Sequence, residues 1–130
     1  MSEDRRAGRE QRVGRVDLRV RTKQFALRVI RLFSALPRRA EADVIGRQLV
    51  RPGTSVGANF REAHRARSDA EFISKVGDCL RELDETCYWL ELLIDAEIIA
   101  GDRLSPLLEE CNQLIAVMTT IAKKVKANPR

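Results

Sequence analysis

The 130-residue sequence is short of aromatic side chains and holds a single histidine, His64. Aromatic residues make up 5% of the chain, which favours a core of aliphatic side chains on helices over a β-sandwich. One histidine is too few for the paired Glu-x-x-His motifs of di-iron helical bundles. No strand-forming run competes with the helical periodicities, so we expect an all-α protein.

Long hydrophobic runs and paired cysteine motifs are also missing. No apolar stretch approaches the roughly 18–20 residues that span a membrane, and no hydrophobic segment follows the charged N-terminus, so we expect neither a membrane anchor nor a secretion signal. The three cysteines, Cys79, Cys87 and Cys111, fall on apolar helical phases and form no CxxC pair. We therefore expect buried free thiols in a cytoplasmic protein.

Charge is plentiful, at 33% of residues, and it is unevenly distributed. Residues 1–24 hold eight basic and four acidic side chains, a balance of +4, and residues 123–130 hold four basic and no acidic ones, again +4. Residues 25–122 hold twelve basic and fifteen acidic side chains, a balance of −3. Basic termini can bind phosphate backbones or simply keep a protein soluble, and both interpretations stay open. The candidate nucleic-acid contacts are Arg5, Arg6, Arg9, Arg12, Arg15, Arg19, Lys123, Lys124 and Lys126.

Residues 1–20 are predicted to be a disordered or loosely packed basic extension, and residues 21–127 a single helical domain. The first helix is predicted from about Thr22 to Leu36, because Pro37 lacks a backbone donor and disfavours a helical residue before it. Its apolar face holds Phe25, Val29, Leu32, Phe33 and Leu36.

The second helix is predicted from about Glu41 to Arg67, in spite of Pro52 in its middle. Its apolar residues keep one helical register on both sides of the proline, which favours a kinked helix over two helices joined by a loop. The hydroxyls of Thr54 and Ser55 can then satisfy backbone carbonyls that the kink frees. That register is held by Ile45, Leu49, Val56, Phe60 and Ala63.

The third helix starts with a predicted capping box, in which the Ser68 hydroxyl accepts from the Glu71 amide and the Glu71 carboxylate reaches back. We expect this helix to run to about Ala100, with Gly101 as a left-handed C-cap. Its predicted core seam, spaced alternately by four and three residues, is Val76, Leu80, Leu83, Cys87, Leu90 and Ile94.

The fourth helix is predicted to start between Asp102 and Ser105, with Pro106 in its first turn as one option. Its apolar stripe is broad enough to contact two neighbouring helices. The stripe consists of Leu104, Leu107, Leu108, Cys111, Leu114, Ile115, Met118, Ile121, Ala122 and Val125. Four helices with short connections predict an antiparallel up-down-up-down four-helix bundle.

No pattern in the sequence is typical of catalysis or of a bound cofactor. Glu62 and His64 point about 200° apart around one helix, so we interpret them, with Glu82 and Glu85, as solvated charges or interchain ion pairs rather than a metal site. No nucleophile–base pair is visible. We therefore predict no enzymatic activity, no catalytic residue, no metal and no cofactor.

A second stripe runs along the third helix, roughly 100° from its core seam. It combines charged side chains with Trp89, which is typical of a subunit interface; the alternative is a tryptophan at the bundle edge, covered by the N-terminal segment. Ser55 and Asn59 share one face of the second helix, and we interpret them as structural hydrogen-bonding residues. The stripe consists of Lys75, Asp78, Glu82, Glu85, Trp89 and Leu92.

Several short motifs occur in an order that resembles one known family. They are Arg21–Ile30 (RTKQFALRVI), Gln48-Leu49, Gly53–Val56 with Asn59, Arg65–Ser68 with Phe72, and Asp84–Thr86 followed by Tyr88–Leu93. In this order they resemble the four-helix-bundle family named for the intervening sequences of bacterial large-subunit ribosomal RNA, and the match covers roughly residues 20–126. Pro52 departs from the small residue usual in that family. The resemblance implies structural or interface roles for Ser55, Asn59, Arg67, Glu71, Glu85 and Trp89.

The same resemblance implies a left-handed antiparallel bundle that assembles as a ring-like homopentamer. Related accessory proteins of diversity-generating retroelements are similar pentamers with a basic surface, thought to bind a reverse transcriptase and nucleic acid. We therefore expect a non-enzymatic homo-oligomeric scaffold that binds RNA, DNA or a reverse-transcriptase-like protein, without contact to a membrane. The alternative is a protein–protein adaptor that does not bind nucleic acid.

Overall fold

The computed structural model describes residues 17–129, and these residues form four long helices. No strand occurs between residues 17 and 129, so the prediction of an all-α protein with four helices is confirmed. Most of the predicted extension, residues 1–16, lies outside the described residues, and residues 18–20 are already helical. The helices are α2 (Leu18–Ala35), α3 (Ala40–His64), α4 (Asp69–Asp95) and α5 (Gly101–Ala127).

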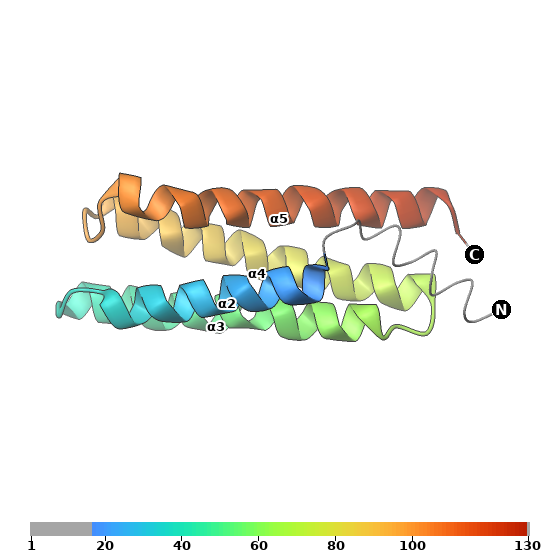
Figure 1. The fold of residues 1–130 in the computed structure, drawn as a ribbon, viewed down its shortest axis with the longest axis horizontal. Coiled ribbons are helices and arrows are strands. Elements are labelled where there is room, and N and C mark those ends of the chain that lie inside the picture. Colours follow the sequence, from blue (N-terminus) through green and yellow to red (C-terminus); the bar gives the residue numbers. More distant parts are fainter. Residues whose placement is uncertain (1–16, 130) are drawn as a thin grey trace.

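The four helices lie lengthwise, and the connections between them fall at alternate ends (Figure 1). α3 packs extensively against both α2 and α4, whereas α5 packs mainly against α4 and touches α2 at few places. An ion pair adds to that slight contact, with Arg21 Nε 2.8 Å from Glu110 Oε2. α4 is therefore the helix that joins α5 to the rest of the fold.

Small residues let α2 approach α3 closely. A Cβ atom added at Gly53 would lie 2.8 Å from a methyl group of Val29, and one added at Gly46 would lie 2.7 Å from side-chain atoms of Phe33 and Leu36. Both distances are below the roughly 3.5–4.0 Å of an optimal carbon–carbon contact, so a larger residue would push the helices apart. The buried positions at this repeating face of α3 are Ala42, Gly46, Leu49, Gly53, Val56, Phe60 and Ala63.

α3 continues through Pro52, so the prediction of one helix rather than two is confirmed. Proline has no N–H to donate to the carbonyl of Gln48, which lies four residues earlier. The hydroxyls of Thr54 and Ser55 each donate over 2.7 Å, to the carbonyls of Val50 and Arg51 respectively. These two bonds therefore support the turn around the proline without replacing the bond lost at Gln48.

The predicted bounds of the first two helices are each wrong by about one turn. α2 begins at Leu18 rather than Thr22, because Asp17 caps it by accepting a hydrogen bond of 2.9 Å from the Arg19 amide. Leu18 is fully buried, which ties this added turn to the core. α3 ends at His64 rather than Arg67.

The start of α4 agrees with the prediction and its end does not. The Glu71 amide donates to the Ser68 hydroxyl over 3.1 Å, so the predicted N-cap is confirmed. The helix ends at Asp95, where the Ile98 amide donates to the Leu93 carbonyl over 3.0 Å and Glu97 adopts a left-handed φ of 58°. These features are typical of a Schellman motif, which normally favours glycine at this position.

The predicted C-cap at Gly101 is wrong, because Gly101 is the first residue of α5. α5 begins after Ala100, which provides no side-chain cap, and Pro106 lies in the second turn rather than the first. All ten predicted apolar positions of α5 are buried or partly buried against the core, so its broad stripe is confirmed.

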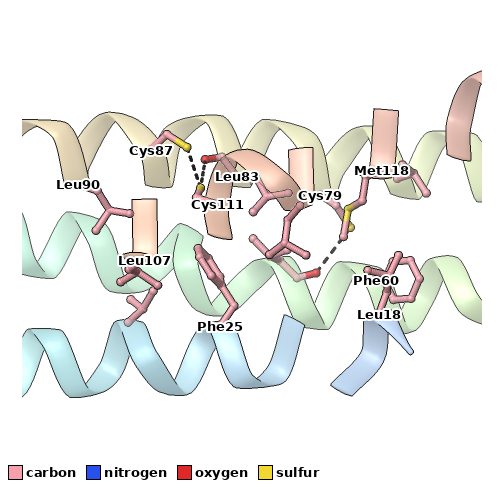
Figure 2. Close-up of a cluster of buried hydrophobic side chains, with 14 of the residues drawn as sticks. Leu18, Phe25, Phe60, Cys79, Leu83, Cys87, Leu90, Leu107, Cys111 and Met118 are labelled. Atoms are coloured by element: carbon pink, nitrogen blue, oxygen red, sulfur yellow. Dashed lines mark hydrogen bonds between the residues drawn. The ribbon is translucent and has the colours of Figure 1, made fainter. Parts of the chain in front are cut away.

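The core seam of α4 lies slightly to one side of the predicted one. Figure 2 shows Cys79, Leu83, Cys87 and Leu90 of this helix among the buried side chains. Leu80 and Ile94 are only partly buried, whereas Cys79, Thr86 and Leu93 are fully buried and were not among the predicted seam residues. The regular spacing of four and three residues is kept. The observed seam is Phe72, Val76, Cys79, Leu83, Thr86, Leu90 and Leu93, with Cys87 beside it.

Candidate nucleic-acid interface

The starts of α2 and α4 lie toward the same end of the bundle as the ends of α3 and α5 (Figure 1). Basic residues are concentrated in these segments. We call residues 17–25, 58–75 and 120–129 the basic end; they include ten basic and four acidic side chains, a balance of +6. Residues 30–47 and 91–109, the opposite end, include five basic and seven acidic side chains, a balance of −2. The ten basic side chains are Arg19, Arg21, Lys23, Arg61, Arg65, Arg67, Lys75, Lys123, Lys124 and Lys126.

Most basic side chains of the basic end have no acidic partner among residues 17–129. Arg19 pairs with Asp17, Arg21 with Glu110, and Lys75 with Glu62. Among residues 17–129, no carboxylate oxygen lies within 4.0 Å of the other seven basic side chains. These seven are Lys23, Arg61, Arg65, Arg67, Lys123, Lys124 and Lys126.

An open groove of about 530 Å³ lies between the start of α2 and the end of α3. Its apolar part includes Val20 and Leu27, which are 53% and 40% exposed. The polar lining comes from both helices and places basic groups of α2 opposite basic groups of α3. Positive charge beside exposed apolar surface suits a ligand that has both anionic and apolar parts. The polar lining residues are Asp17, Arg19, Lys23, Gln24, Arg61, His64 and Arg65.

One carboxylate lies within the groove, and its charge is already matched. The Arg19 side chain donates to Asp17 over 3.1–3.2 Å, and this bond holds the pKa of the Asp17 carboxyl below its ordinary value. Asp17 is therefore ionised at neutral pH, where it also caps α2. The unpaired Lys23, Arg61 and Arg65 then dominate the charge of the groove.

The predicted nucleic-acid contacts fall into three groups. Arg5, Arg6, Arg9, Arg12 and Arg15 lie outside the described residues.

Arg19 lines the groove and forms an ion pair with Asp17. Lys123, Lys124 and Lys126 are exposed on the last turns of α5. Sequence reasoning missed Arg61 and Arg65 as contacts because they lie inside the acidic body of the chain. Their four-residue spacing on one helical face was visible, but their position opposite Lys23 follows only from the packing of α2 on α3.

The stripe around Trp89 forms a separate polar network between α3 and α4. Arg51 donates to Glu85 over 2.8 Å and lies 3.7 Å from Glu82. Trp89 Nε1 donates to Glu85 over 3.1 Å, and its ring meets Tyr88 edge to face at 5.0 Å. Trp89 is only partly buried, so part of its indole ring stays available for another contact.

The remaining family-motif residues are Ser55 and Asn59 on α3, Arg67 after it, and Glu71 in the first turn of α4. Ser55 donates to the carbonyl of Arg51 in its own helix, and the half-buried Asn59 makes no side-chain hydrogen bond among residues 17–129. Arg67 and Glu71 are exposed at the connection between α3 and α4.

Within residues 17–129, no group of three or more His, Cys, Asp or Glu side chains is placed to hold a metal ion. None of the helices formed by these residues is both long and apolar enough to cross a membrane.

Comparisons with known proteins identify the family. A crystal structure from Bacteroides thetaiotaomicron VPI-5482, described as a protein with unknown function from the S23 ribosomal protein family, is similar with a TM-score of 0.77. The two chains are 36% identical, over 82% of this chain and 99% of the other. No curated protein matches this chain. A sequence profile of the 23S rRNA-intervening sequence protein family matches residues 16–120, and the chain therefore belongs to that family.

Proposed function

We propose that this chain is a non-enzymatic helical scaffold that binds nucleic acid, and RNA in particular, through its basic end. The observation that supports this most strongly is the groove between α2 and α3. There Lys23, Arg61 and Arg65 converge from two helices without a carboxylate partner among residues 17–129.

Unpaired, solvent-exposed cations suit a phosphate backbone for a physical reason. Each phosphate that a cation neutralises releases condensed counterions from the nucleic acid, which favours binding and makes it dependent on salt. Cations already paired with carboxylates, such as Arg21, would first have to break that pair. The exposed side chains of Val20 and Leu27 offer apolar contact to sugars or bases.

The names of similar proteins favour RNA as the first ligand to test. The matching family is named for an intervening sequence of 23S rRNA, and the related crystal structure is assigned to an S23 ribosomal protein family. Both names refer to ribosomal components.

The scaffold is proposed to be an antiparallel up-down-up-down bundle that assembles as a ring-like homopentamer through the stripe around Trp89. Support comes from polar groups in and beside that stripe which make no hydrogen bond within residues 17–129. A buried oxygen of Glu82 accepts no hydrogen bond there, since Arg51 is 3.7 Å away, and the Asn59 amide makes none. A neighbouring copy could satisfy both groups. Five basic ends on one ring would strengthen binding to a long anionic chain.

Fluorescence anisotropy with a labelled single-stranded RNA tests the nucleic-acid proposal. The variant Lys23→Ala/Arg61→Ala/Arg65→Ala should bind more weakly than wild type, and the slope of log K against log salt should fall in magnitude by about 2–3. The matched control, Arg31→Ala/Arg38→Ala/Arg103→Ala, removes three unpaired cations from the opposite end and should keep the wild-type slope. No binding at low salt, or the same loss in both variants, would overturn the proposal.

A protein partner is the second candidate, and exposed apolar side chains on α2 favour it. Val20, Leu27 and Ile30 are between 40% and 53% exposed on one helix. In this alternative, a partner protein remains bound to wild type after nuclease treatment and is lost from Val20→Ser/Leu27→Ser. A complex that disappears with nuclease would instead support nucleic-acid binding.

A further inference from the structure

Two buried thiols face each other between α4 and α5. The Sγ atoms of Cys87 and Cys111 lie 2.8 Å apart, and the Cys111 thiol is also 3.2 Å from the carbonyl oxygen of Leu83 (Figure 2). Both cysteines are free, and Cys87 retains 7% of its exposed surface whereas Cys111 retains none. The third cysteine, Cys79, is fully buried elsewhere in the seam and lies 3.6 Å from the Val56 carbonyl oxygen.

We propose that Cys87 and Cys111 form an oxidation site, at which a small hydroperoxide converts the two thiols into a disulfide that links α4 to α5. A disulfide bond is about 2.0 Å long, so the two sulfurs need to approach by only about 0.8 Å from their 2.8 Å separation. Side chains on two packed helices can make such a movement without a change of fold.

Cys87 is the thiol that reacts first. When Cys87 loses its proton, the Cys111 thiol donates a hydrogen bond to it and lowers the pKa of Cys87, although burial and the nearby Glu91 and Asp84 oppose this. The hydrogen bond that the Cys111 thiol gives to Cys87, and then burial, raise the pKa of Cys111. Burial raises the pKa of Cys79 to about 12, so Cys79 has almost no thiolate at neutral pH.

Cys87 lies near the protein surface beside α5. Cys87 Sγ lies 3.6 Å from the amide oxygen of Asn112, which is exposed. Asn112 also lines an open hollow of about 490 Å³ on the outer face of α5, together with Leu108 and Gln113. A small neutral oxidant suits this position, because Asp84 and Glu91 would repel an anionic disulfide such as oxidised glutathione.

The reaction balances with hydrogen peroxide as the oxidant. The Cys87 thiolate attacks one peroxide oxygen, the O–O bond breaks, and the departing hydroxide takes up the proton that Cys87 released. Cys87 is then a sulfenic acid. The Cys111 sulfur attacks the Cys87 sulfur, and the sulfenic oxygen leaves as water with the proton of Cys111. Two thiols are oxidised to one disulfide, and one peroxide is reduced to two waters.

The full-length reduced protein can be tested directly with hydrogen peroxide under native conditions. After quenching, denaturation and alkylation, peptide mass spectrometry should find the Cys87 and Cys111 peptides joined, two hydrogen atoms lighter than the separate pair. Cys79 should be alkylated as in the untreated protein. The oxidised protein should unfold about 5–15 °C higher, because the bond closes a loop across α4 and α5, and a dithiol should reverse the shift.

Two variants separate this site from general thiol oxidation. Cys79→Ala should still form the Cys87–Cys111 link. Cys111→Ser, which keeps a hydrogen-bond donor beside Cys87, should leave Cys87 as a sulfenic acid that dimedone traps, with circular dichroism confirming that the variant is folded. The proposal is overturned if wild type forms only links between chains, if Cys79 is oxidised as fast as Cys87, or if Cys87 advances to a sulfinic acid without linking to Cys111.

Discussion

The two ends of the bundle differ both in charge and in how their helices begin. At the basic end a side chain caps each helix start: Asp17 accepts from the Arg19 amide over 2.9 Å, and Ser68 accepts from the Glu71 amide over 3.1 Å. At the opposite end, α3 and α5 begin without a side-chain cap. The end with excess positive charge therefore has the better-fixed helix starts.

Local pairing widens the difference between the ends. At the opposite end Arg39 pairs with Glu41 and Arg47 with Asp43, so these arginines are neutralised by neighbours in the sequence. The unpaired cations of the basic end come from separate helices and meet only in the fold. The net charge of +5 does not show which cations are paired and which are not. Only the positions of the side chains in the fold show this difference between the two ends.

Charge reversal should separate the two ends most strongly. Arg61→Glu/Arg65→Glu should weaken RNA binding at low salt by about 100-fold or more, because it replaces two phosphate contacts with repulsion. Arg38→Glu/Arg103→Glu changes the net charge by the same amount at the opposite end. This variant should weaken RNA binding by less than about fivefold. Anisotropy titrations at one salt concentration make the comparison. Equal losses would mean that overall charge, and not the groove, governs binding.

Both ends depend on the close contact of α2 with α3 at the middle of the bundle. Gly53→Ala should lower the free energy of unfolding by about 1–3 kcal/mol, because the new methyl group meets Val29 at 2.8 Å. Gly77→Ala, which meets nothing within 4 Å, should raise it by about 0.5–1 kcal/mol. Urea unfolding measures both. A stabilising effect of Gly53→Ala would contradict the close approach of α2 to α3.

The capping difference predicts opposite effects at the two ends. Ser68→Ala should lower the free energy of unfolding by about 1 kcal/mol, since the Glu71 amide loses its acceptor. Ala100→Ser should raise it by up to about 1 kcal/mol, because it adds a cap where none exists. Urea unfolding curves for both variants would contradict this comparison if the changes had the same sign.

The turn after α4 gives the opposite end a second weakness. Glu97 adopts a φ of 58°. This left-handed conformation is energetically unfavourable for a residue with a Cβ atom and favourable for glycine. Glu97→Gly should therefore raise the free energy of unfolding by about 0.5 kcal/mol, after the added freedom of the unfolded chain is subtracted. Glu91→Gly, an exposed position inside α4, should lower it by about 1 kcal/mol. Thermal unfolding of the pair should show shifts in opposite directions.

The smallest effect is the acid sensitivity of the cap on α2. The Arg19 bond lowers the pKa of Asp17 in the folded protein below its ordinary 3.8. The stabilisation from the ionised carboxylate is thus present above that ordinary value and is lost as the pH falls through the lower folded value. The stability difference between wild type and Asp17→Asn should be constant from about pH 7 to 5 and shrink below about pH 4. The stability difference between wild type and Ser68→Ala should not shrink over the same pH range, because the serine cap has no titrating group.

Much of the fold follows from local rules that the sequence displays. The repeat of apolar residues places all four helices, and the Ser68 cap is confirmed because it needs only residues three positions apart. Register across Pro52 indicated one helix, since packing at Leu49 and Val56 continues on both sides of it. The end of α4 was mispredicted because Glu97 adopts a conformation that sequence rules reserve for glycine.

The candidate interface was less predictable than the fold. Arg61 and Arg65 were read as part of an acidic body, and nothing local connects them to Lys23, almost forty residues earlier. Their convergence depends on how closely α2 lies on α3, which Gly46 and Gly53 allow. The contact between Cys87 and Cys111 was equally unpredictable from the sequence, because it depends on how α4 packs on α5.

Photocrosslinking of a bound RNA that carries 4-thiouridine, followed by mass spectrometry of the attached peptides, tests the basic end most directly. We predict crosslinks within residues 17–25, 58–75 and 120–129 that fade as salt is raised. Crosslinks concentrated in residues 30–47 and 91–109, or spread evenly over both ends, would contradict the assignment.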